Sequence, residues 1–128
     1  MPMSIDAYLR AVKERLLTDP VVASFHVMRE RATMVDGYIR ARLVFTDESY
    51  LEFSEYVQVA VDEIQVVTYS YQWATAENRL LKRWDNTPHF PKLPNFPHHI
   101  HDGTAVIPGQ PVDIFAVLDQ IIQSGNTS

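Results

Sequence analysis

The chain contains no cysteine. This absence excludes disulfide frameworks, zinc–thiolate sites, iron–sulfur clusters and thiol nucleophiles, because each of them requires cysteine sulfur. Any catalytic chemistry must therefore come from other side chains, and the histidines are the first candidates.

Long apolar runs are also missing. No stretch approaches the roughly 18 consecutive apolar residues that a membrane-spanning helix needs. The first residues, Met1-Pro2-Met3-Ser4, do not form the basic region and apolar stretch of a secretory signal peptide. We therefore expect a cytoplasmic protein that does not contact a membrane.

Positive charge is scarce overall but concentrated in one segment. The formal net charge of −5 argues against a protein that coats DNA through general electrostatic attraction. Residues 78–101 nevertheless carry Arg79, Lys82, Arg83 and Lys92 against the single acid Asp85. Four of the five histidines lie in the same segment, so the locally basic part of the chain is also the richest in titratable groups.

Two amphipathic helices are predicted, one near each end of the chain. Residues 5–17 carry apolar side chains at helical spacing, with Ser4 as a cap. Near the C-terminus, Pro111 suits the first helical position, Asp113 the first turn, and Gly125 the end. The expected buried stripes are Ile5, Tyr8, Leu9, Val12 and Leu16, and Ile114, Val117, Leu118 and Ile121.

Strand patterns fill the chain between these helices as far as residue 85. Asp36-Gly37 predicts a two-residue turn that pairs Met34 with Ile39 and Glu30 with Leu43. A three-residue turn at residues 47–49 would bring Leu51 opposite Phe45. Residues 64–73 and 80–84 predict two further strands, joined by a turn at residues 76–78.

These elements predict an α+β fold in two layers. An antiparallel meander of about five strands would carry the N-terminal and C-terminal helices on one face. At 128 residues the chain suits a single domain over residues 1–128, with a loop at residues 85–108. An open sheet edge would also permit a homodimer.

The segment after Asp85 is rich in proline and histidine. Its four prolines recur every third residue, which is the period of a polyproline II helix: Pro88, Pro91, Pro94 and Pro97. Such a stiffened loop could hold His89 and the cluster His98, His99 and His101 in defined positions.

Several interpretations of this segment remain open. His99 and His101 would point the same way in an extended chain and could bind a metal with His89 or Asp85. Alternatively, the segment could cleave RNA without metal, using acid–base histidines and cations for the phosphate. It could also be a structural strap with no chemistry, or a proline-rich ligand for a partner.

For the RNA-cleavage interpretation we assign roles to residue types. His98 and His99 or His101 would supply the acid and the base, with His89 as a further candidate, and Asp85 would orient an imidazole. The phosphate-binding candidates are Arg83, Lys82 and Lys92. The candidates for stacking on bases are Trp84, Phe90 and Phe96, although the same rings could instead pack on the sheet.

A second candidate phosphate surface is the arginine quartet Arg29, Arg31, Arg40 and Arg42, which the strand pattern places on one face. The competing interpretation is a solvated, ion-paired face, with Glu52, Glu55 and Glu63 as partners. Tyr69 and Tyr71 share a strand face and are expected in the core.

The motif Arg83-Trp84-Asp85-Asn86-Thr87-Pro88-His89, followed by Phe96-Pro97-His98-His99-Ile100-His101, resembles the TumE-like toxin family. The resemblance covers roughly residues 66–122 and includes Tyr69 and Tyr71 ahead of the motif. Family members often carry a second histidine directly after the first, where this chain has Phe90.

The resemblance implies the toxin component of a prokaryotic toxin–antitoxin pair, with a small helix-turn-helix antitoxin as partner. It implies no established reaction, so the ribonuclease hypothesis comes from the residue types. The alternative is a non-catalytic binding module in which the His/Pro segment is a strap or a docking surface.

Overall fold

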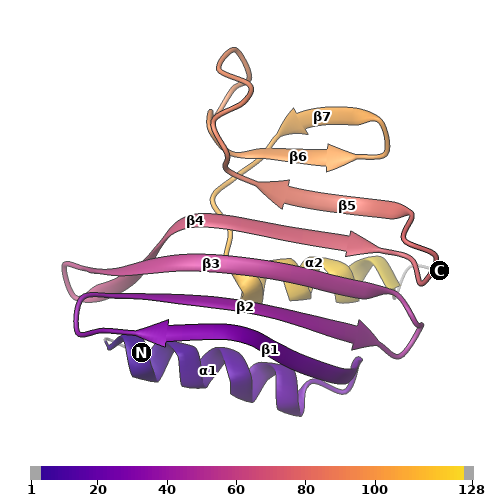
Figure 1. Cartoon of the computed structure of the whole chain (residues 1–128). Helices are drawn as coiled ribbons and strands as arrows, with labels where there is room; N and C mark the ends of the chain where they lie inside the picture. The colour runs from indigo at the N-terminus through magenta and orange to yellow at the C-terminus, as the bar shows by residue number, and fades with distance from the viewer. Residues whose placement is uncertain (1–3, 126–128) are drawn as a thin grey trace.

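The computed structural model describes residues 4–125 as one antiparallel sheet with two helices (Figure 1). The elements are α1 (Ile5–Thr18), β1 (Val22–Ala32), β2 (Asp36–Phe45), β3 (Tyr50–Ala60), β4 (Glu63–Ala74), β5 (Leu80–Asp85), β6 (His99–Asp102), β7 (Ala105–Pro108) and α2 (Ile114–Gly125). The strands follow one another in the sheet in their sequence order, so each is joined to its neighbour by a hairpin. This arrangement is the predicted α+β meander.

Both helices cover the same face of the sheet (Figure 1). In α1 the Ser4 hydroxyl accepts a hydrogen bond from the Ala7 amide at 3.1 Å, which confirms the predicted cap. The predicted apolar stripes of both helices are buried against the strands. Neither helix is long and apolar enough to cross a membrane.

Strand alternation divides the sheet residues between two faces. On β2, Ile39, Ala41 and Leu43 are buried under the helices, whereas Arg40 and Arg42 lie on the other side and are exposed. We call the side of the sheet opposite the helices the open face.

The predicted first hairpin turn is wrong. Asp36 and Gly37 begin β2, and Glu30 pairs with Ile39 instead of Leu43. The turn lies at residues 33–36, where the Thr33 hydroxyl accepts from the Val35 and Asp36 amides. Gly37 has another role: a Cβ there would lie 2.5 Å from Ile5 Cγ2, so glycine permits α1 to approach.

The register of β2 with β3 and the start of α2 also differ from the prediction, although each residue stays on the predicted face of its strand or helix. Leu51 pairs with Leu43 instead of Phe45, because the turn is centred one residue earlier than expected: the Phe45 amide donates to the Ser49 carbonyl at 2.8 Å. Pro111 lies before α2, which begins at Ile114, and Asp113 acts as the cap: its carboxylate accepts from the Ala116 amide at 2.9 Å.

The sheet has seven strands, not about five. The predicted loop at residues 85–108 contains the short hairpin of β6 and β7, which extends the sheet beyond β5. The His/Pro loop is therefore shorter than predicted and covers residues 86–98. As a result, His99 and His101 are strand residues whose positions are fixed by pairing with β5.

Candidate functional site

The strand register aligns polar residues in two rows across the open face. The first row runs from β1 to β6 through Arg29, Arg40, Ser54, Ser70, Asp85 and His99. The second row runs from β2 to β6 through Arg42, Glu52, Gln72, Arg83 and His101. Arg40 and Arg42 therefore lie in these rows on β2, with Arg29 and His26 opposite them on β1, and His99 and His101 lie at the β6 end.

The histidine end is a compact cluster of aromatic rings. The rings of His99 and His101 are 5.0 Å apart between centroids and meet edge to face. Phe90, from the His/Pro loop, packs against both of them at 4.9 and 5.9 Å. The spacing of His99 and His101 predicted that their side chains point the same way, and on β6 both lie on the open face.

His99 is held in one orientation. Its Nδ1 lies 3.0 Å from the Pro97 carbonyl oxygen, and because a carbonyl only accepts, Nδ1 is the donor. In the neutral ring Nε2 is then unprotonated, and it is buried without a hydrogen-bond partner among residues 4–125. The side chain is only 2% exposed, whereas His101 is partly exposed.

Asp85 and Arg83 form a fixed pair beside the histidines. The Arg83 Nε and Nη2 atoms donate to the same Asp85 oxygen at 3.0 and 2.9 Å. The other Asp85 oxygen accepts from the Thr87 amide at 2.6 Å, at the start of the His/Pro loop. Asp85 was expected to orient an imidazole, but its carboxylate binds Arg83 and Thr87, and His99, which lies across the strand pair from it, donates to the Pro97 carbonyl.

The environment shifts the pKa values of this cluster. Burial acts to raise the pKa of Asp85, but the hydrogen bonds from Thr87 and the charges of Arg83 and His99 outweigh it and leave the pKa below its usual value. Burial lowers the pKa of His101, and the neighbouring His99 and Arg83 lower it further. His101 is therefore predominantly neutral at pH 7, the form in which an imidazole accepts a proton.

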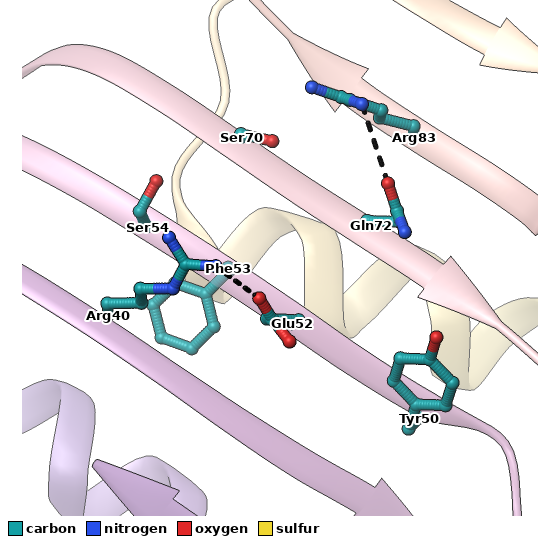
Figure 2. A pocket seen from close by; sticks show the side chains of 8 residues that line it. All are labelled: Arg40, Tyr50, Glu52, Phe53, Ser54, Ser70, Gln72 and Arg83. Carbon is teal, nitrogen blue, oxygen red and sulfur yellow. Dashed lines mark hydrogen bonds and ion pairs between the residues drawn. The ribbon is translucent and has the colours of Figure 1, made fainter. Parts of the chain in front are cut away.

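A polar pocket lies in the middle of the open face (Figure 2). It has a volume of about 310 Å³, and its polar lining includes Arg40, Glu52, Ser54, Ser70, Gln72 and Arg83. At one side of it Arg40 pairs with Glu52 at 2.5 Å. On the other side Arg83 donates to Gln72 at 3.4 Å. The pocket therefore connects the arginine end of the rows with the histidine end.

The arginine quartet occupies the other end of the open face, as the sequence predicted. Glu52 is the acidic partner there, and it also lies 3.5 Å from Arg42. Glu55 is not a partner, which corrects that expectation: strand alternation turns it under the helices, where it is buried. Glu63 lies at the start of β4, near one end of the sheet.

His98 lies apart from His99 and His101, which corrects the expectation that it acts with them. His98 is the last residue of the loop before β6, and its ring stacks on Tyr69 on the helix side, with centroids 5.8 Å apart. The Tyr69 hydroxyl and His98 Nδ1 share a hydrogen bond of 2.7 Å. Burial raises the pKa of Tyr69 to about 12 and lowers that of His98.

Other predicted site residues also lie outside the cluster. Trp84 is 2% exposed in the core and donates to Gln120, so its ring offers no face to a nucleic-acid base. Lys82 lies on the helix side, 5.5 Å from the Trp84 ring, because it alternates with Arg83. His89, Lys92 and Phe96 are exposed residues of the His/Pro loop.

The family model described as Toxin TumE matches residues 12–124 of the chain. The chain belongs to the TumE toxin family. Membership implies a toxin component that is paired with an antitoxin, as the resemblance suggested. No curated protein and no solved structure matched in the comparisons.

In this TumE family member the predicted metal ligands do not converge. Across residues 4–125, no group of three or more histidine, aspartate or glutamate side chains is arranged to hold a metal ion. His99 and His101 are close together, but the Phe90 ring separates this pair from the exposed His89. The centroid of the Phe90 ring is 6.4 Å from that of His89 and 4.9 Å from that of His99.

The polar residues in the middle of the open face were not predicted as part of the site. Ser54, Ser70 and Gln72 had no motif to mark them, and only the register shows that they connect the arginines with the histidines. The available signal was alternation: β3 and β4 place polar residues at every second position, between apolar residues that face the core.

Proposed function

We propose that this toxin is a ribonuclease whose reacting groups are His99 and His101, assisted by Arg83. The observation that carries the proposal is the pair of imidazoles with centroids 5.0 Å apart, directly across a strand pair from Arg83 and Asp85. Two imidazoles and a guanidinium are the groups that cleavage of an RNA phosphodiester requires.

In the proposed reaction His101 is the base. Its neutral ring takes the proton from a ribose 2′-hydroxyl, whose oxygen forms a bond to phosphorus as the bond from phosphorus to the 5′ oxygen breaks. His99, which takes up a proton at Nε2 when the loop over it moves aside, gives that proton to the departing 5′ oxygen, leaving a 2′,3′-cyclic phosphate and a 5′-hydroxyl. Arg83 neutralises the charge on the non-bridging oxygens, and Asp85 fixes the direction of Arg83.

The His/Pro loop controls access to His99 in this proposal. Phe90 packs on both imidazoles, and His99 Nε2 is buried, so the loop carrying Phe90 moves aside when RNA binds. Thr87 ties the start of this loop to Asp85, which confines the movement to the residues that follow.

The test is induced expression of the wild type, His101→Ala and the control Arg10→Ala, with growth and total RNA examined. Arg10 is an exposed residue of α1, on the side of the sheet opposite the histidine cluster. We expect growth arrest and RNA fragments from the wild type and the control, and neither from His101→Ala with an unchanged melting temperature. Arrest of growth with intact RNA would overturn the ribonuclease proposal.

The antitoxin provides a second control. The resemblance suggests a small helix-turn-helix protein encoded by the neighbouring gene, and its co-expression should restore growth and protect the RNA.

A second candidate function is a non-catalytic binding module with the His/Pro loop as a strap. The observation in its favour is the burial of His99 against Phe90 and the Pro97 carbonyl, an arrangement that stabilises the end of the sheet without chemistry. Under this alternative, His99→Ala would lower the melting temperature, and the RNA would stay intact in cells that express the wild type.

A further inference from the structure

The open face concentrates positive charge on an acidic protein. Five arginines lie on it and come from three strands: Arg29, Arg31, Arg40, Arg42 and Arg83. Two carboxylates lie among them, Glu52 and Asp85, and both pair with arginines. The named groups therefore carry a net charge of +3, on a chain whose net charge is −5.

The remaining acids of this face are placed away from the two rows. Asp36 lies at the start of β2, where its carboxylate accepts from Thr33 and Tyr56, and Glu63 lies at the start of β4. Arginines therefore lie on both sides of the polar pocket, Arg40 and Arg42 on β2 and Arg83 on β5 beside the histidines, and Glu52 is the charged row residue between them.

We infer that the substrate is single-stranded RNA whose backbone lies along these two rows, across the strands, from the arginines to the histidine cluster. This inference rests on the proposed function and adds the substrate class and its path. Arg40 on β2 and His99 on β6 are four strand spacings apart, roughly 19 Å at about 4.8 Å per spacing. That span accommodates several nucleotides, within the about 4 to 16 that single-strand-binding surfaces cover.

The residue types along the rows suit a sugar–phosphate backbone. Arg29 and Arg40 are direct cross-strand neighbours of like charge, and Glu52, which pairs with Arg40, offsets their repulsion only in part because it also lies beside Arg42. Ser54 and Ser70 pair across β3 and β4 and present hydroxyls to the polar pocket. Phosphate oxygens accept hydrogen bonds from both kinds of side chain.

Aromatic residues beside the arginines favour a single strand over a duplex. Tyr38 and Tyr56 pair across β2 and β3 on the open face, next to Arg31, and both are partly exposed. Unpaired bases stack on such rings, whereas bases inside a duplex cannot reach them. RNA with splayed bases would therefore contact both the arginines and the tyrosines.

The experiment measures binding apart from cleavage. Fluorescence anisotropy is recorded with a labelled single-stranded RNA of mixed sequence, using His101→Ala as the parent protein so that the RNA stays intact. The test variant adds Arg29→Gln and Arg40→Gln, which leaves Arg42 beside Glu52. The matched control adds Arg10→Gln on α1 and Arg79→Gln in the loop after β4, two exposed arginines outside the rows.

We expect the test variant to bind about tenfold or more weakly, as loss of two charge-assisted phosphate contacts predicts. The slope of log affinity against log salt should fall by about 1.4, because each phosphate contact contributes about 0.7 with single strands. The control variant should stay within about twofold of the parent, and a duplex of the same sequence should bind less tightly than the single strand.

Equal losses in the test and control variants, or equal affinity for duplex and single strand, would overturn this inference. So would test variants that bind RNA normally but no longer bind the antitoxin, because the arginines would then serve a protein partner. None of these results depends on cleavage, so the inference can fail while the ribonuclease proposal stands, and the reverse also holds.

Discussion

Glu55 lies on the helix side of β3 with no exposed surface. Its carboxylate accepts three hydrogen bonds: from the Tyr8 hydroxyl at 2.5 Å, the Tyr71 hydroxyl at 2.6 Å and the Ile114 amide at 2.8 Å. These donors come from α1, β4 and the start of α2. A single buried carboxyl group therefore joins both helices to the sheet.

The stability of the protein should depend on the protonation of Glu55. Burial raises its pKa, and nearby Asp113 adds to the effect, although the hydrogen bonds from Tyr71, Tyr8 and Ile114 oppose it. The folded protein thus binds this proton more tightly than the unfolded chain. The stabilisation is complete below the ordinary glutamate pKa of 4.5 and is lost as the pH rises through the raised value.

Urea unfolding of the wild type and Glu55→Gln as a function of pH measures this dependence. From pH 4.5 upwards we expect the stability of the wild type to fall relative to that of the variant, which has no proton to lose. The lowered pKa values of His98 and His101 act in the opposite direction, with stability lost as the pH falls below 6.5, but they are common to both proteins. Parallel curves would contradict the prediction.

At the scale of single elements, the start of α2 depends on Asp113. Its carboxylate accepts from the Ala116 amide, and its backbone carbonyl accepts from Val117. Asp113→Ala should lower the free energy of unfolding by about 1 kcal/mol, the usual cost of losing an N-cap. Asp113→Asn should retain most of the stability of the wild type, because asparagine is an equally good N-cap residue. Thermal unfolding of the three proteins checks this, and equal losses in both variants would exclude capping as the cause.

Elements with local periodic patterns could be predicted from the sequence. The helix stripes and the alternation of β2 to β4 depend on neighbouring residues alone, so Val12, Leu118 and Tyr71 were correctly assigned to the core. The β6–β7 hairpin was missed because each strand has only four residues, and the prolines before it suggested an irregular loop. The apolar Ile100 between two histidines, followed by Gly103 at a positive φ of 63°, was the available signal.

The register of the first hairpin could not be predicted from the neighbouring residues alone. Asp36-Gly37 has the composition of a turn, yet that glycine is required by contact with Ile5 of α1, which lies more than thirty positions earlier in the chain. For the site, the pairing of Asp85 with His99 depends on the same kind of long-range information. Trp84 was misassigned although it alternates with Arg83 and Asp85, a pattern that already places it on the other face.

At the scale of the whole molecule, both helices and the sheet share one core. Buried residues of α1 and α2 belong to the same hydrophobic cluster as those of β2 to β5, including Trp84. A chain of 128 residues built in this way should unfold in a single cooperative transition.

Two optical signals test this cooperativity. In a Trp73→Phe background, fluorescence reports on Trp84 beside α2, while far-ultraviolet circular dichroism reports on all helices and strands. We expect the same midpoint in urea from both signals. An earlier fluorescence transition would show that the C-terminal strands and α2 separate from the remaining sheet before it unfolds.

The meander gives the open face a modular construction. Each of the strands β2 to β6 contributes one side chain to each row, and the neighbouring residues in the chain point to the other face. A substitution at one of the exposed row positions therefore changes one surface position and leaves the packing beneath it intact. Relatives of this chain could diverge in what they recognise through single surface replacements, one hairpin at a time, while keeping the same interior.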